Sequence, residues 1–175
     1  MANIQNDTKG GDVMLGEHEV ISLLNAAKYL FLRDISEPEE NSLRLLVEEA
    51  IADSTKTATT SEPASPFAGM LKSATPVETV EGCRRFELLW RRYVAYLVTE
   101  EGVGSGGNYG DEVYSGELFR IYTKSHFLEH LSRDTGGHFE SIRHYKVICQ
   151  NHIIDVASYS PPELRLSQSN GVRVN

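Results

Sequence analysis

The chain has 175 residues, of which 40% are hydrophobic, and its 17 basic and 25 acidic side chains give a net charge of −8. This length and composition indicate one globular domain with a core of its own. The acidic balance argues against nucleic-acid binding, because Lys and Arg supply most of that affinity. No stretch approaches the roughly 18 apolar residues of a membrane helix, and the polar start lacks the apolar run of a signal peptide. We therefore expect a soluble cytoplasmic protein without a membrane contact.

The charge is distributed unevenly along the chain. Residues 1–53 carry 11 acidic and 4 basic side chains, whereas the remainder carries 14 and 13. An acidic N-terminal third favours a basic protein partner, mainly by raising the rate of encounter. The alternative is that this charge only keeps the protein in solution. Cys83 and Cys149 form no CxxC motif, which favours reduced thiols, although a disulfide between them stays open.

Residues 1–16 are predicted to be a flexible tail, and residues 17–53 a helical segment packed on the core. From Glu17 onward, apolar residues three or four positions apart predict a first helix. They are Val20, Leu23, Leu24, Ala27, Leu30 and Phe31.

A second helix is predicted over residues 37–53. Ser36 and Glu39 have the spacing of a capping box, and Pro38 is tolerated in a first helical turn. A strand remains the alternative, because Leu43, Leu45 and Val47 alternate with other residues.

Residues 54–78 are rich in Ser, Thr, Ala and Pro, which predicts a mobile linker. Residues 79–166 are predicted to form a β-rich core. Within it, residues 84–98 carry apolar side chains on both alternating faces, which indicates a long strand, with a helix as the alternative.

The rest of the core divides into short elements. Residues 117–123 read as a strand, and Ser125 is placed to cap a short helix that ends near Asp134. Residues 144–158 read as a β-hairpin around Gln150 and Asn151, and residues 167–175 as a flexible tail. The predicted fold class is α+β, with N-terminal helices followed by an antiparallel β-sheet with one short helix.

The sharpest catalytic candidate is the H-x-x-E-H pattern of His126, Glu129 and His130. Histidines four positions apart lie on one face of a helix, where they can share a zinc ion while the glutamate activates a bound water. The third ligand would be His138, His144, His152 or Asp155. The competing interpretation is an ordinary amphipathic helix that turns these polar residues to water.

Asp155 forms a second candidate, because it lies between apolar residues of a predicted strand. A half-buried carboxylate needs a partner, which is either a catalytic imidazole or a structural donor. Strand alternation places His152 and Asp155 on opposite faces, so these two residues are not expected to pair with each other.

Two further patterns receive structural interpretations. Gly102, Gly104 and Gly107 match G-x-G-x-x-G, but no helix is predicted after them and acidic residues flank them, so a loop is expected. Four arginines, at positions 84, 85, 91 and 92, interleave with aromatic residues. We expect them to pair first with the acidic N-terminal third, and only then to serve a protein interface.

The leading hypothesis is a non-enzymatic protein that binds another, basic protein and needs no cofactor. An acidic immunity protein or inhibitor that neutralises a basic effector is its concrete form. The predicted partner-binding residues are Glu37, Glu39, Glu40, Glu48, Glu49, Trp90 and Tyr93. A zinc-dependent hydrolase built on His126, Glu129 and His130 is the alternative, and self-association is a third hypothesis.

Overall fold

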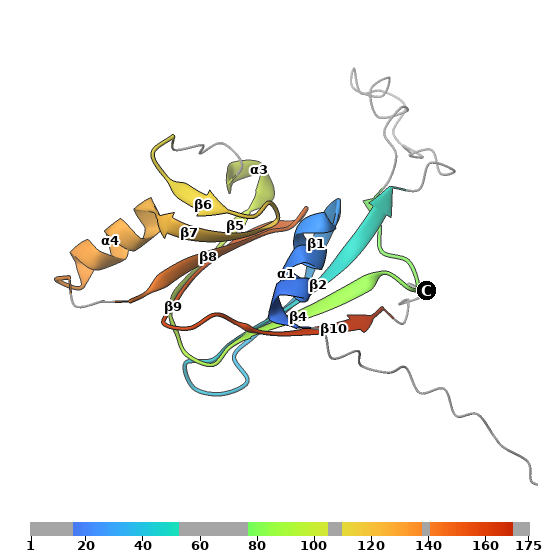
Figure 1. Cartoon of the computed structure of the whole chain (residues 1–175), viewed down its shortest axis with the longest axis horizontal. Coiled ribbons are helices and arrows are strands. Elements are labelled where there is room, and N and C mark those ends of the chain that lie inside the picture. Colours follow the sequence, from blue (N-terminus) through green and yellow to red (C-terminus); the bar gives the residue numbers. More distant parts are fainter. Residues whose placement is uncertain (1–15, 53–76, 105–109, 138–140, 170–175) are drawn as a thin grey trace, which may run out of the picture.

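The computed structural model describes residues 16–52, 77–104, 110–137 and 141–169. Figure 1 shows strands gathered into two sheets, with helix α1 (Glu17–Ala26) lying across them and helix α4 (His126–Asp134) at one end. A short helix, α3 (Glu101–Gly104), follows one of the strands. No helix in these ranges combines the length and the apolar character needed to cross a membrane.

Among the described residues, each sheet has five strands, and these strands all pair antiparallel. The first sheet has the order β1–β2–β4–β10, and β3 also pairs with β2. Its strands are β1 (Tyr29–Ser36), β2 (Leu43–Ala52), β3 (Val77–Glu78), β4 (Arg84–Trp90) and β10 (Glu163–Gln168). The second sheet has the order β5–β9–β8–β7–β6. Its strands are β5 (Tyr93–Glu100), β6 (Val113–Ser115), β7 (Phe119–Lys124), β8 (Arg143–Ile148) and β9 (His152–Ser158).

Two chain segments continue from one sheet into the other. β4 passes into β5 through Arg91 and Arg92 alone, and β9 passes into β10 through residues 159–162. Because β4 pairs with β10 and β5 pairs with β9, the same two segments run antiparallel across both sheets. The sheets are therefore joined by a bent two-stranded ribbon.

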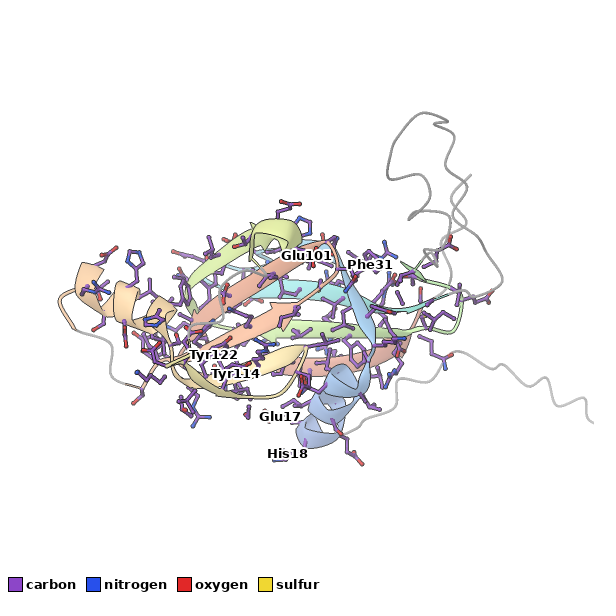
Figure 2. All side chains as sticks on the ribbon, turned by 90° about the horizontal axis from the view of Figure 1, so that it is seen from above. Glu17, His18, Phe31, Glu101, Tyr114 and Tyr122 are labelled. Atoms are coloured by element: carbon purple, nitrogen blue, oxygen red, sulfur yellow. The ribbon has the colours of Figure 1, made fainter. Side chains whose placement is uncertain are left out.

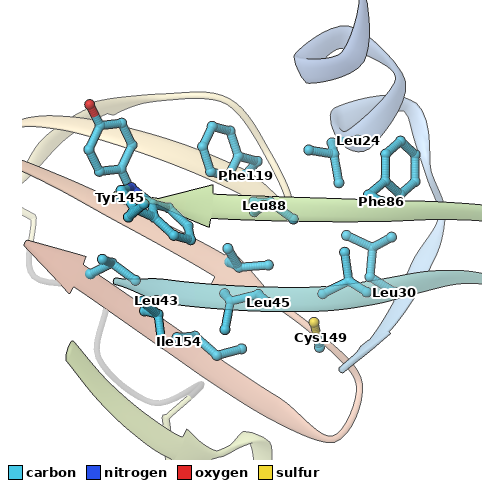
Figure 3. Close-up of a cluster of buried hydrophobic side chains, with 14 of the residues drawn as sticks. Leu24, Leu30, Leu43, Leu45, Phe86, Leu88, Phe119, Tyr145, Cys149 and Ile154 are labelled. Carbon is cyan, nitrogen blue, oxygen red and sulfur yellow. The ribbon is translucent and has the colours of Figure 1, made fainter. Parts of the chain in front are cut away.

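The hydrophobic core collects side chains from both sheets and from α1. Figure 3 shows Leu24 of α1, Leu45 of β2, Leu88 of β4 and Ile154 of β9 within one cluster, and all four are fully buried. Its aromatic residues include Tyr145, whose ring centroid lies 5.9 Å from that of Trp90 and 6.1 Å from that of Phe119. Burial of this apolar surface is the main favourable contribution to folding.

The helix predicted over residues 37–53 is wrong. Residues 43–52 form β2, which pairs with β1 on one side and β4 on the other, so the strand alternative holds. Leu43, Leu45 and Val47 are fully buried, as their alternation indicates. The first predicted helix is confirmed but ends at Ala26, and its last apolar positions belong to β1.

Other predicted elements are confirmed. The α4 helix begins after Ser125, whose Oγ accepts a hydrogen bond from the Leu128 amide at 3.1 Å. β8 and β9 form the predicted hairpin, and β7 corresponds to the strand expected at residues 117–123. The long strand predicted over residues 84–98 is divided at Arg91 and Arg92 into β4 and β5.

The predicted tails and linker fall largely outside the described residues, namely at 1–15, 53–76 and 170–175. Two of the boundaries are wrong, because Val77 and Glu78 form β3, and Ser167 and Gln168 belong to β10.

Cys83 and Cys149 are free thiols, and burial raises the pKa of Cys149 to about 12.

Candidate functional site

The histidines of the H-x-x-E-H pattern lie on α4, but each ring nitrogen of His126 already contacts a carboxylate. Its Nδ1 lies 3.1 Å from Glu129, and its Nε2 lies 2.8 Å from Asp111. Hydrogen bonds with Asp111 and then Glu129 raise the pKa of His126, and the same imidazole lowers the pKa of Asp111. The arrangement holds the segment around Asp111 against the first turn of α4.

His130 turns to a different neighbour. Its Nε2 lies 3.5 Å from the Asp134 carboxylate one turn later, and both side chains are largely exposed. Within the described residues, no three His, Cys, Asp or Glu side chains converge as a metal site would require. Of the third-ligand candidates, His144 and Asp155 bind each other on the sheet, and His138 lies outside the described residues.

Asp155 has the partner that its position required. Its Oδ1 lies 2.7 Å from Nε2 of His144 and 3.2 Å from Nζ of Lys146, both on the neighbouring strand β8. Burial acts to lower the pKa of Lys146, but the charge of Asp155 and the contact with Tyr122 outweigh it, so the pKa is raised. His152 is not part of this group, as the strand alternation indicated.

Aromatic rings pack against His144, which belongs to the polar group around Asp155. Tyr122 stacks on His144 with centroids 4.2 Å apart, and Phe127 of α4 covers the same ring at 5.1 Å. Tyr114 lies beside Tyr122, as Figure 2 shows. Nδ1 of His144 is buried without a hydrogen-bond partner. A general base must reach its substrate, so this imidazole fits a structural role better than a catalytic one.

Two depressions adjoin where α4 meets β7 and β8. Their volumes are about 290 and 690 Å³, and Thr123, Leu128 and Ile142 line both. Ser125 lines the smaller one, but its hydroxyl oxygen caps α4. Glu129 also lines the smaller depression, and its carboxylate already contacts the ring of His126.

Three of the predicted partner-binding residues are used inside the protein. Trp90 is completely buried in the core. The Glu48 carboxylate binds Arg33 and Arg85 at 2.8 Å each, and Glu49 binds the Arg84 guanidinium. The hydrogen bond from Arg84 lowers the pKa of Glu49. Trp90 and Glu48 are buried, so assigning these two to a partner surface is wrong, whereas the assignment of Glu49 stays a prediction. The expected internal pairing of Arg84 and Arg85 is confirmed.

The other four residues lie near one another around the β1–β2 loop. Glu37 Oε1 accepts hydrogen bonds from the hydroxyls of Tyr93 at 2.9 Å and Tyr96 at 3.1 Å. These hydrogen bonds raise the pKa of both tyrosines. Glu39 lies only 4.0 Å from Arg91 but is largely exposed, and Glu40 is exposed. The structure thus joins an acidic loop to the start of β5.

The residues that continue this surface were missed by the sequence analysis. Tyr96, Leu97 and Val98 are consecutive on β5, and 36%, 51% and 37% of their respective surfaces are exposed. We call Glu37, Glu39, Glu40, Tyr93, Tyr96, Leu97 and Val98 the β5 surface. Apolar residues on both alternating faces of residues 93–98 were the available signal, but alternation does not tell an edge strand from a central one.

Comparisons with family models, with curated proteins and with solved structures find no match to this chain.

Proposed function

We propose that this chain is a non-enzymatic cytoplasmic protein that binds a basic protein partner through the β5 surface. The observation that carries the proposal is the exposure of Tyr96, Leu97 and Val98 on a strand that contacts the acidic β1–β2 loop, where Glu37 accepts a hydrogen bond from Tyr96. Exposed apolar groups rimmed by polar residues are typical of protein interaction sites, and the acidic rim favours a partner of opposite charge.

The apolar residues of β5 and the acidic residues of the β1–β2 loop contribute to binding in different ways. Desolvation of aromatic and aliphatic side chains supplies most of the affinity at such surfaces, whereas exposed charges mainly speed the encounter. The shared hydrogen bonds to Glu37 also fix Tyr93 and Tyr96, whose rings meet edge to face at 5.1 Å. Fixed aromatic side chains lose little conformational entropy on binding.

The concrete form of this proposal is an acidic inhibitor or immunity-type protein that neutralises a basic effector. Its support is the acidic N-terminal third together with the absence, within the described residues, of a converging metal site. It needs no cofactor.

The test is affinity capture from an extract of the cells that express the protein. We expect a basic partner that binds the wild type stoichiometrically and elutes as the salt concentration is raised. The variant Glu39→Lys/Glu40→Lys should associate about tenfold more slowly with that partner, because encounter rates follow charge.

A matched variant, Glu81→Lys/Glu117→Lys, makes the same charge change at two exposed positions outside the β5 surface. It should retain most of the association rate. Equal slowing in both variants would show that only net charge matters, and a capture without a stoichiometric basic partner would contradict the proposed function.

A further inference from the structure

The two strand orders end at β1 and β10 and at β5 and β6, and three of these four end strands are protected among the described residues. Gln150 and Asn151 cover the free side of β1: the Gln150 amide donates to Leu30 O at 2.8 Å, and the Asn151 side chain hydrogen-bonds both N and O of Leu32. β10 carries alternating charges at Glu163 and Arg165, and β6 has only three residues. Such devices prevent strands of other chains from pairing.

β5 is the exception. The amide of Tyr93 donates to Asn41 O of the β1–β2 loop at 3.0 Å, and beyond that point only β9 pairs with the strand in the described part of the chain. The pairing with β9 shifts at Val94, and among the described residues the regular edge that follows, residues 95–100, is open over about 20 Å, at roughly 3.3 Å per residue. The exposed apolar residues of the β5 surface lie along this edge.

The register separates the two faces of this edge. Tyr96 and Val98 pair with Val156 and Ile154 of β9, which point into the core, whereas Leu97 pairs with Asp155 on the opposite face. Glu100 shares the face of Tyr96 and Val98, because residues two apart point the same way. Glu37 meets this face at Tyr96. We call the face of the β5 edge that carries Tyr96, Val98 and Glu100 the inner rim. It is apolar in its centre and acidic at both ends.

We propose, on the basis of the proposed function, that the basic partner binds by adding an extended segment as a sixth strand along β5. Main-chain hydrogen bonds to a sheet edge would supply affinity, and alternate side chains would supply specificity. The rim selects a seven-residue pattern of basic–x–apolar–x–apolar–x–basic, in which the basic residues meet Glu37 and Glu100 and the apolar residues meet Tyr96 and Val98.

A second copy of this chain fits the edge less well. Antiparallel self-pairing centred on Leu97 brings Glu100 of each copy to the end of the other strand at which Glu37 contacts Tyr93 and Tyr96. Like charges brought together across strands are destabilising. The charge of the edge therefore favours a basic segment over self-association.

The test uses the full chain and the peptide acetyl-KTVTVTK-amide, followed by two-dimensional NMR. We expect the peptide to shift the amide signals of residues 94–100 selectively. Val98→Lys, which puts a cation on the inner rim, should weaken binding about tenfold or more. Val113→Lys makes the same change at an exposed position on β6 and should not.

Two N-methylated peptides separate strand addition from other binding modes. One carries methyl groups on its odd-numbered amides and the other on its even-numbered amides, so that side chains and charge are unchanged. In a strand, alternate amides point to opposite sides, so one of the two peptides should lose binding and the other should keep it.

The remaining outcomes overturn the strand model in distinguishable ways. If both methylated peptides bind like the parent, while Glu39→Lys/Glu40→Lys still weakens binding, the acidic surface binds basic chains without strand addition. If no shift appears at residues 94–100 at millimolar peptide, strand addition is wrong, and capture of the cellular partner judges the proposed function separately. Concentration-dependent dimerisation in light scattering, with broadening confined to β5, would assign the edge to a second copy instead.

Discussion

At the scale of single residues, Glu48 connects every long strand of the first sheet. It lies on β2 and binds Arg33 of β1, Arg85 of β4 and Ser169, which directly follows β10. Glu48 as a residue is 4% exposed, whereas the two arginines keep much of their surface in water. Its charge is therefore compensated inside the protein.

We expect Glu48→Ala to lower the free energy of unfolding by about 2 kcal/mol, because two guanidinium groups and a hydroxyl lose their acceptor. Partial solvation of the arginines keeps the loss below that of a fully buried pair. Urea denaturation measures the change. Glu40→Ala, at an exposed position of the same charge, is the control and should alter stability by less than about 0.5 kcal/mol. Equal losses of unfolding free energy in the two variants would contradict the stabilising role of the Glu48 contacts.

Single residues also show where sequence reasoning stops. Trp90, Glu48 and Glu49 are of residue types that fit an interface, and nothing in their neighbours shows that the first is core and the others are paired. Asp155 was different, because a carboxylate between Ile and Val requires a partner wherever the strand lies. Its burial was predictable, but the identity of His144 depended on strand pairing.

At the scale of elements, α4 is held mainly at its first turn. The Glu112 carboxylate accepts from the His126 amide at 2.9 Å, and the His126 ring lies between Asp111 and Glu129. Because those carboxylates raise the pKa of His126, its protonation stabilises the attachment below the ordinary pKa of histidine. This contribution is lost as the pH rises through the raised value.

We expect Asp111→Asn to lower the pH at which His126 titrates, since it removes the first of the two carboxylates that favour the charged ring. A proton NMR titration of the imidazole signals measures this midpoint. Asp134→Asn removes a carboxylate that contacts His130 and should leave the His126 midpoint unchanged. An unchanged midpoint in Asp111→Asn would show that the contact does not persist in solution.

The helices and strands were predicted unequally well for a physical reason. α4 has its own signals, a serine cap and a polar face, so local sequence was sufficient. Residues 43–52 lie between two strands and carry apolar side chains on more than one face, which satisfies a helical spacing as well as a strand. Tertiary pairing decided the outcome, as it often does for such segments.

At the scale of the whole molecule, Asn151 links the two sheets through side-chain hydrogen bonds. It lies in the β8–β9 turn of the second sheet, and its side chain forms two hydrogen bonds with Leu32 of the first. The contact also closes the outer side of β1, so it serves both cohesion and protection of an edge.

We expect Asn151→Ala to lower the free energy of unfolding by about 1–3 kcal/mol, through two lost hydrogen bonds and the unpaired backbone they leave. Gln150→Ala is the matched control, because Gln150 contributes its backbone amide, which the substitution retains. Urea denaturation compares the two variants. If Asn151→Ala were as stable as Gln150→Ala, the two side-chain hydrogen bonds of Asn151 would contribute nothing to the free energy of unfolding.

The β5 surface belongs to this largest scale, which explains why only half of it was foreseen. Its acidic loop follows from composition and charge. Its exposed apolar strand follows from sheet order, because β5 is the last strand of its sheet, and order is set by pairings far apart in the chain.

The bent ribbon also has a consequence for biosynthesis. The second sheet is built from residues 93–158, a continuous stretch inserted between two neighbours of the first sheet, β4 and β10. During synthesis, β10 leaves the ribosome only after the whole inserted stretch has done so. Until that point the side of β4 that pairs with β10 lacks its outer neighbour, so the first sheet is completed only after residues 163–168 have been synthesised.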